Sequence, residues 1–253
     1  MESTNESNNG NLQKFSREDI EGFFCGCVDE VAKELIGVHL FNRTNGRLFG
    51  GKIIETEAYC ANDPAAHCHP SSFRFKKSNP MGSPGGYVYR HFSRGWCLNL
   101  TSGPKSKKFG SAVLIRALQP MRNSVPLADT DLTNVCNGPV KLCKLLGLVD
   151  DQYNGSPVWE TSLELYRPVG EPDPIVKCGK RVNISEKEAA VWPRSYVLDE
   201  VDAVAFLSPP AKKIRDREHY PPVLLKQLKT SGPLAGCMYL SRATNNSTEN
   251  PSA

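Results

Sequence analysis

The stretch Ile53-Ile54-Glu55-Thr56-Glu57-Ala58-Tyr59 decides the fold, because it carries an apolar strand directly into two carboxylates and an aromatic ring. A charged group beside a buried strand is costly unless it is paired or performs a function. The stretch therefore predicts either a functional carboxylate at Glu57 or an ordinary strand with structural or surface carboxylates. These residues alone leave both interpretations open.

Side chains suited to a binding pocket follow this strand. They end the short segments Asp63-Pro64-Ala65-Ala66-His67, Tyr87-Val88-Tyr89 and Trp96-Cys97-Leu98-Asn99. Two aromatic rings, a carboxylate, an imidazole and an amide gathered from short elements are what a pocket for a planar polar ring requires. We therefore predict such a pocket at the end of the strand.

Length and composition set the limits of the function. The 253 residues fit one large domain, and 31 basic against 27 acidic residues permit a polyanionic partner without demanding one. The first fifteen residues hold no apolar run, so we expect no signal peptide and a soluble protein inside the cell. Nine cysteines at irregular spacing favour reduced thiols over a disulfide framework.

The expected organisation is a disordered leader over residues 1–14, one domain over 15–206, and a basic, Pro-rich, partly disordered tail over 207–253. Ser16-Arg17-Glu18-Asp19 caps a helix that we expect to end near Ile36, before Gly37. Strands over 38–42 and 49–54 are joined by the hairpin signal Asn45-Gly46, which would place Glu57 at the exit of the second strand.

Apolar runs predict further strands at 87–89, 96–100, 112–118, 158–166 and 182–184. Asn137-Gly138-Pro139 begins a helix that ends before Gly147. Arg116 interrupts the strand over 112–118 and needs an anionic partner. Glu57 is one candidate, and a structural pair with Glu55 or another acid is an equal one.

Two further features of the sequence each allow two interpretations. Phe92 has basic neighbours and is either a plug of the core or an exposed aromatic. The loop-like segment 60–86 carries Arg74, Lys76 and Lys77, and it is either a path for a phosphate backbone or a solvated loop.

No cofactor or metal is expected. Cys60, His67, Cys68 and His69 are potential zinc ligands, but they lack the paired short spacings of structural zinc sites. Neither standard Gly-rich phosphate loop occurs, and no cysteine has the neighbourhood of an activated nucleophile.

At this point the sequence resembles the alkyladenine, or 3-methyladenine, DNA glycosylases of the mammalian and bacterial type. The resemblance runs from about Glu30 to Gly147 and rests on several blocks in the same order, and a weaker resemblance continues through Arg181-Val182 to Tyr196. These are Glu55-Thr56-Glu57-Ala58-Tyr59, Ala65-Ala66-His67, Pro84-Gly85 before Tyr87-Val88-Tyr89, Trp96-Cys97-Leu98-Asn99, Val113-Leu114-Ile115-Arg116-Ala117-Leu118, and Asn137-Gly138-Pro139 with Lys141-Leu142.

The resemblance implies a single α+β domain on a curved antiparallel sheet with surrounding helices, and an enzyme that flips a damaged purine out of duplex DNA. It implies that Glu57 deprotonates a water molecule while Arg116 holds that water and the carboxylate. By the same likeness Tyr59 and Tyr89 sandwich the base, His67 closes the pocket, and Asn99 screens the groups that a purine carries.

The implied partner is double-stranded DNA that contains a damaged purine, bound by a monomer in the nucleus, without a membrane. Basic residues on the loops and turns are the expected contacts to the DNA backbone: Arg74, Lys76, Lys77, Arg94, Lys105, Lys107, Lys108 and Lys141.

The sequence departs from the family at one informative place. Where the family has a Tyr-Gly pair whose aromatic ring wedges into the duplex, this chain has Phe92-Ser93 followed by Arg94. Phe92 is still expected to wedge, but the missing glycine changes the turn. The alternative to an active enzyme is therefore a catalytically idle binder of damaged DNA. A protein-interaction module that uses the Pro-rich tail is a third hypothesis.

Overall fold

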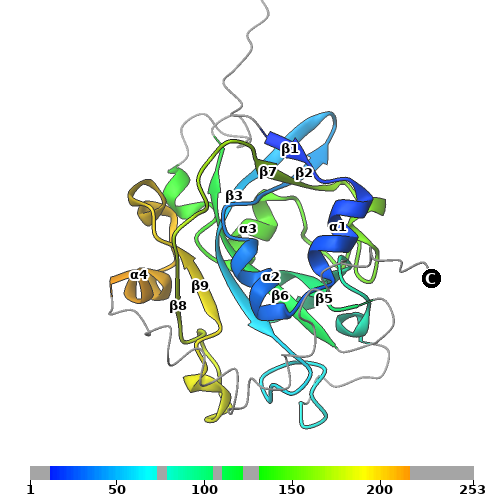
Figure 1. Cartoon of the computed structure of the whole chain (residues 1–253), viewed down its shortest axis with the longest axis vertical. Helices are drawn as coiled ribbons and strands as arrows, with labels where there is room; N and C mark the ends of the chain where they lie inside the picture. The colour runs from blue at the N-terminus through cyan, green and yellow to red at the C-terminus, as the bar shows by residue number, and fades with distance from the viewer. Residues whose placement is uncertain (1–11, 73–78, 105–109, 122–130, 217–253) are drawn as a thin grey trace, which may run out of the picture.

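The structure, a computed structural model, describes residues 12–72, 79–104, 110–121 and 131–216. Within them a nine-stranded antiparallel sheet that does not close on itself, with helices around it, forms a single α+β domain (Figure 1). This confirms the fold class that the sequence predicted.

The strands run in the spatial order β1-β7-β2-β3-β6-β5-β4, and β9 joins β3 to β8. Their bounds are β1 Leu12–Lys14, β2 His39–Thr44, β3 Arg47–Tyr59, β4 Val88–Phe92, β5 Trp96–Ser102, β6 Ser111–Pro120, β7 Leu163–Pro168, β8 Val176–Gly179 and β9 Ser195–Leu198. The helices are α1 Arg17–Phe24, α2 Val28–Glu34, α3 Pro139–Leu145 and α4 Pro209–Asp216, with short 3₁₀ turns at Pro80–Gly82, Leu132–Asn134, Val158–Glu160, Ala189–Val191 and Val201–Phe206.

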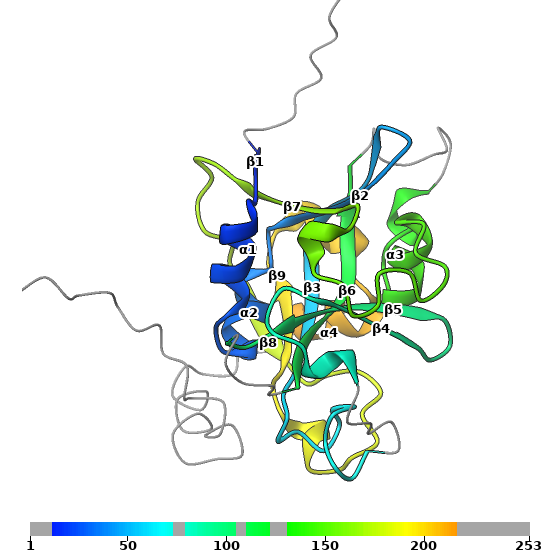
Figure 2. The ribbon, with the colours of Figure 1, turned by 90° about the vertical axis from the view of Figure 1, so that its right-hand side faces the viewer.

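Strand β3 is the centre of the sheet because it has neighbours along both edges. Its first half pairs with β2 and residues 55–57 pair with β9, while β6 follows the opposite edge. Helices α2 and α3 pack against β3 and β6, and α4 covers β8 and β9 (Figures 1 and 2). The strand that the sequence singled out therefore pairs with three other strands, and its second half is largely buried.

Alternation along β3 separates two kinds of side chain. Ile54 and Ala58 belong to the main apolar core, and the Thr56 hydroxyl donates to the backbone oxygen of Ala32 on α2 at 2.7 Å. Successive side chains of a strand point to opposite faces, so Glu55 and Glu57 leave β3 on the other face. The apolar half of the pattern holds the strand in place, and the polar half is left to form a site.

The first helix differs from the prediction of one helix ending near Ile36. Ser16 and Asp19 form the predicted capping box, but α1 ends at Phe24 and α2 begins after Cys27. The backbone N–H of Gly103 donates to the Phe24 oxygen at 2.8 Å. A tertiary hydrogen bond thus uses a carbonyl that a continuing helix would have needed, and Gly26 adds its low helix propensity.

The hairpin between β2 and β3 is confirmed, with φ of 50° at Asn45 and 75° at Gly46, as a tight two-residue turn requires. The second strand is longer than predicted, since it continues to Tyr59. Glu57 therefore lies inside β3 and not at its exit. Pairing with β6 and β9 extends the strand beyond the apolar run.

The predicted strand over 182–184 is wrong. Asn183 has φ of 55°, which no extended strand allows, and β8 and β9 lie on either side of this segment. Residues 158–160 form a 3₁₀ turn, and the predicted strand there begins only at Leu163. Strands over 87–89, 96–100 and 112–118 and the helix from Pro139 are present, with bounds shifted by a few residues.

Elements also occur at both ends of the predicted domain. Residues 12–14 of the expected leader form β1 because they pair with β7, and residues 209–216 of the expected tail form α4. The Lys14 ammonium group anchors β1 through Glu164 on β7 at 2.8 Å. The domain boundaries themselves stay a prediction.

Candidate active site

The register of the sheet places four side chains in one row. Tyr89 on β4 pairs with Asn99 on β5, Asn99 pairs with Leu114 on β6, and Leu114 pairs with Glu57 on β3. Directly paired residues of antiparallel strands point to the same face. Three predicted site residues from different strands therefore share one face of the sheet, and Leu114, which the sequence did not single out, lies between two of them.

Glu57 is fully buried and is held on both carboxylate oxygens. Its Oε1 accepts the backbone N–H of Val182 at 2.8 Å, and its Oε2 accepts the Tyr59 hydroxyl at 2.9 Å. The guanidinium of Arg116 lies 3.4 Å from Oε2 through Nη1. A buried carboxylate with these partners has a fixed orientation, as a positioned general base requires.

Arg116 contacts both of its candidate partners. Its Nε donates to Glu55 at 2.6 Å, which is shorter than its contact to Glu57. Glu55 and Glu57 are two residues apart on the same face of β3, and the register between β3 and β6 shifts on both sides of Glu55. Burial by itself lowers the pKa of Arg116, but the two carboxylates outweigh it and leave the pKa above its ordinary value.

Tyr59 connects the carboxylate to a second apolar cluster. Burial, and then the negative charge of Glu57, raise the pKa of its hydroxyl well above the ordinary value. The hydroxyl therefore keeps its proton and donates to Glu57. Its ring packs against a small apolar cluster that includes Tyr89 and Ala66, apart from the main core.

His67 arrives from the loop after β3 and meets Tyr89. The two atoms His67 Nδ1 and Tyr89 Oη lie 2.6 Å apart, and the rings meet edge to face with centroids 6.0 Å apart. The structure thus brings the predicted imidazole and the second predicted tyrosine together, although 22 positions separate them in the sequence.

His91 is a site residue that the sequence analysis missed. The Asn99 side-chain nitrogen donates to the backbone oxygen of Tyr89 at 3.0 Å and lies 3.2 Å from His91 Nδ1. Since a carbonyl only accepts, the amide orientation is fixed, and His91 Nδ1 must act as an acceptor. His91 stands two residues after Tyr89 on the same strand, so strand alternation was the signal that could have found it.

Phe92 is an exposed aromatic and not a plug of the core, because 56% of its surface is accessible. It lies at the tip of the β4–β5 hairpin, where its ring meets Trp96 edge to face at 5.6 Å. A side chain at Gly95 would come within 2.4 Å of Val140, so the hairpin tip lies directly against α3. The turn is therefore supported by the helix.

The predicted backbone contacts are only partly described. Arg94 at the hairpin tip and Lys141 on α3 are exposed, and the Lys141 ammonium donates to Asn137 at 2.7 Å. The other predicted contacts lie outside the described residues: Arg74, Lys76, Lys77, Lys105, Lys107 and Lys108. Their role stays a prediction.

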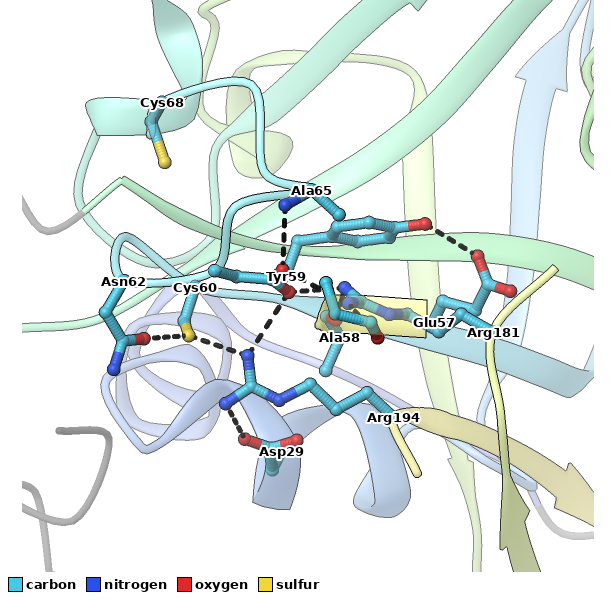
Figure 3. Close-up of polar contacts among 12 residues, drawn as sticks. Asp29, Glu57, Ala58, Tyr59, Cys60, Asn62, Ala65, Cys68, Arg181 and Arg194 are labelled. Carbon is cyan, nitrogen blue, oxygen red and sulfur yellow. Dashed lines mark hydrogen bonds and ion pairs between the residues drawn. The ribbon is translucent and has the colours of Figure 1, made fainter. Parts of the chain in front are cut away.

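A buried cluster of ion pairs beside Glu57 was also missed. Asp63 pairs with Arg181 and, at 3.3 Å, with Arg194, which in turn lies 3.4 Å from Asp29 on α2 (Figure 3). Arg181 and Asp63 are 118 positions apart. Asp63 was visible only as the start of the segment that ends in His67, and nothing in the sequence indicated its partners.

The four potential zinc ligands make separate contacts. The Cys60 thiol donates to Asn62, the Cys68 thiol donates to the backbone oxygen of Gly110, His67 faces Tyr89, and His69 Nδ1 lies 2.7 Å from the Ser71 hydroxyl. Burial raises the pKa of the Cys68 thiol to about 12, which opposes the thiolate that a metal would need. In the part of the chain that the structure describes, no three His, Cys, Asp or Glu side chains come together as a metal site. Likewise, none of the described helices is both long and apolar enough to cross a membrane.

Comparisons with known proteins identify relatives of this chain. A protein of Rhizobium etli is 38% identical over 186 residues, which are 69% of this chain and 83% of the relative. One of Granulibacter bethesdensis is 34% identical over 193 residues, or 72% and 84%, and one of Rhodopseudomonas palustris is 37% identical over 175 residues, or 67% and 82%. All three are named as candidate 3-methyladenine DNA glycosylases.

The relatives and the family match place the chain in the DNA glycosylase class. Residues 22–200 match the model of the methylpurine-DNA glycosylase family, and the chain belongs to that family. The resemblance seen in the sequence is thereby confirmed, and the match extends beyond Gly147 into the segment that carries Arg181 and Arg194. The relatives named above are bacterial, so they lend no support to a nuclear location.

Proposed function

We propose that this protein excises alkylated purines, 3-methyladenine among them, from duplex DNA by hydrolysing the N-glycosidic bond. The observation that carries the proposal is the buried Glu57 carboxylate, which is fixed on both oxygens in the same row as Asn99 and Tyr89. Family membership and the names of the relatives support the same activity.

In the proposed reaction Glu57 takes a proton from a water molecule, and the water oxygen forms a bond to the sugar carbon C1′. The bond between C1′ and the base nitrogen breaks, and its electron pair leaves with the base. A purine alkylated at N3 or N7 already carries positive charge, so its departure needs no general acid, and the arrangement resembles that of an inverting glycosidase without the acid. The Arg116 guanidinium would hold the water and the Glu57 carboxylate.

The flipped base would lie between Tyr59 and Tyr89, with His67 at one side. Aromatic faces attract a cationic base, which is one source of preference for alkylated purines over normal ones. The fixed amide of Asn99 would meet the edge of the base and select among the groups that it carries.

Duplex DNA would be held by the exposed cations and by Phe92. Arg94 and Phe92 share the hairpin tip, so a phosphate contact and an inserted ring would act at the same step of the duplex. We also propose that the protein acts as a monomer; the nuclear location expected above stays a prediction without support.

The test is an abasic-site assay on an oligonucleotide duplex with a single ethenoadenine, and on matched duplexes with 3-methyladenine, 7-methylguanine or hypoxanthine. We expect alkali-labile sites in at least one damaged duplex and none in the undamaged duplex. Binding to the damaged duplexes without any strand cleavage would instead show the idle DNA-binding protein.

A further inference from the structure

Arg181 is fixed against the ring of Tyr59. Its guanidinium lies 4.5 Å from the ring centroid, and its side chain is fully buried. Nη1 donates to the backbone oxygen of Ala58 at 3.0 Å and Nη2 to that of Ala189 at 3.3 Å, while both nitrogens also face the Asp63 carboxylate. A guanidinium with this many acceptors has one available orientation.

The next residue holds the catalytic carboxylate. The Val182 backbone N–H donates to Glu57, and the Tyr59 hydroxyl donates to the other oxygen of the same carboxylate. The two-residue segment 181–182 therefore contacts both the ring on which a base would stack and the proposed general base.

Arg181 also determines which face of Tyr59 a base can use. An aromatic ring has two faces, and the guanidinium covers one of them, as Figure 3 shows beneath the ring. Tyr59 also packs against the cluster that contains Tyr89 and Ala66. A flipped base must therefore stack on the face that Arg181 leaves open, and the position of Arg181 sets the height and tilt of that face.

The charge of Arg181 is balanced. A bare cation behind Tyr59 would repel a positively charged base, but Asp63 pairs with Arg181 in a buried, two-pronged contact. Arg194 shares Asp63 at 3.3 Å, and its guanidinium lies over Trp192 at 5.0 Å. Arg181 and Arg194 thus have the same partner, and the contact to Tyr59 distinguishes Arg181.

We propose that Arg181 is a positioning residue of the glycosylase site, which fixes the Tyr59 ring so that a stacked base places its sugar carbon beside the water on Glu57. This inference rests on the proposed function and deepens it. Displacement of a reacting group by about 1 Å can cost about a hundredfold in rate. The orientation of the Tyr59 ring should therefore affect the excision rate directly.

The experiment compares Arg181→Lys with the matched control Arg194→Lys. Lysine keeps the charge next to Asp63 but lacks the planar fork that fills several acceptors at once. Single-turnover excision of ethenoadenine at saturating enzyme is measured for both, together with thermal unfolding and the fluorescence of the etheno base on binding. We expect Arg181→Lys to lower the excision rate by about 10- to 100-fold and to change the base fluorescence, and Arg194→Lys to stay close to wild type when the two melting temperatures are similar.

If the two variants lose the same fraction of activity, or if neither does, Arg181 is structural and the positioning role is wrong. If Arg181→Lys does not fold, Arg181→Gln combined with Asp63→Asn removes both charges of the pair and is subject to the same comparison. If wild type releases no base but the etheno fluorescence still depends on Arg181, the proposed function fails while the positioning role stands. A rate loss confined to the Arg181 variants supports both.

Discussion

The carboxylate centre on β3 and the tip of the β4–β5 hairpin are opposites in how they are held. Glu57 has no exposed surface and contacts Val182, Tyr59 and Arg116, whereas Phe92 is 56% exposed and meets Trp96 at one ring edge. A reacting group is more effective when its orientation is fixed and bulk water is excluded from its surroundings. A ring that must enter another molecule has to be accessible before that molecule arrives.

The largest expected effect comes from replacing the Glu57 carboxylate by a group of the same shape that cannot act as a base. Glu57→Gln should lower the single-turnover excision rate by about 10²- to 10⁴-fold, because an amide cannot accept the proton from water. Fold and affinity for damaged duplex should be retained, as measured by thermal unfolding and by a filter or anisotropy titration. Near-wild-type cleavage by Glu57→Gln would mean that another group is the base.

Glu55→Gln is the matched control for that substitution. Glu55 is as buried as Glu57 and accepts the shorter bond from Arg116. It lies four residues from Tyr59 in β3, whereas Glu57 lies two residues from it. We expect a clear drop in melting temperature, because a buried guanidinium loses its nearest anion, with a much smaller loss of excision rate per folded molecule. Equal rate losses in the two variants would assign the base role to the pair.

The next effect comes from removing the exposed ring. Phe92→Ala should lower excision by about tenfold or more, because the ring offsets part of an unstacking cost of a few kcal/mol. Its melting temperature should stay near wild type, because the ring contributes little to the core, and Phe92→Tyr should be tolerated. If Phe92 were part of the core, its truncation would lower the stability by about 3–5 kcal/mol. A loss of that size would mean that Phe92 does not act in base flipping.

A smaller and more distributed effect is expected from the predicted phosphate contacts. Affinity for undamaged duplex should fall with salt at a log–log slope on the order of −0.9 for each phosphate neutralised. Changing Lys105, Lys107 and Lys108 together to Ala should make the slope shallower without changing the excision rate of bound substrate. An affinity that does not depend on salt would exclude these residues as phosphate contacts.

The smallest effect is expected at the outer edge of the sheet, where Glu164 joins Lys14 and Arg43 at 2.8 Å each. These partners, chiefly Arg43, lower the pKa of Glu164 to about 2. A carboxylate with a lowered folded-state pKa contributes stability above its unfolded pKa and loses it as the pH falls through the folded value. The melting-temperature difference between wild type and Glu164→Gln should therefore be constant above about pH 5 and shrink toward pH 2, and it should be modest because both cations are about half exposed. A difference that grows on acidification would contradict the pairing.

Local patterns in the sequence determined much of this molecule. The Asn45-Gly46 turn, the capping box at Ser16 and the apolar run before Glu55 each specify their own conformation through short-range backbone preferences and burial. The family blocks then pointed to Glu57 as the central residue, and the structure holds it at the centre of the sheet.

Tertiary structure alone decided which groups meet Glu57 and Tyr59. Arg181 and Val182 reach them across more than 100 positions, and their segment reads locally as a strand, yet Asn183 turns it out of extended geometry. The sequence left Glu55 and Glu57 as alternative partners of Arg116, and only the folded sheet, whose register is irregular at Glu55, shows that Arg116 contacts both. Sequence periodicity specifies which face a side chain takes, but long-range charge pairing and sheet irregularities depend on elements that only the folded chain brings together.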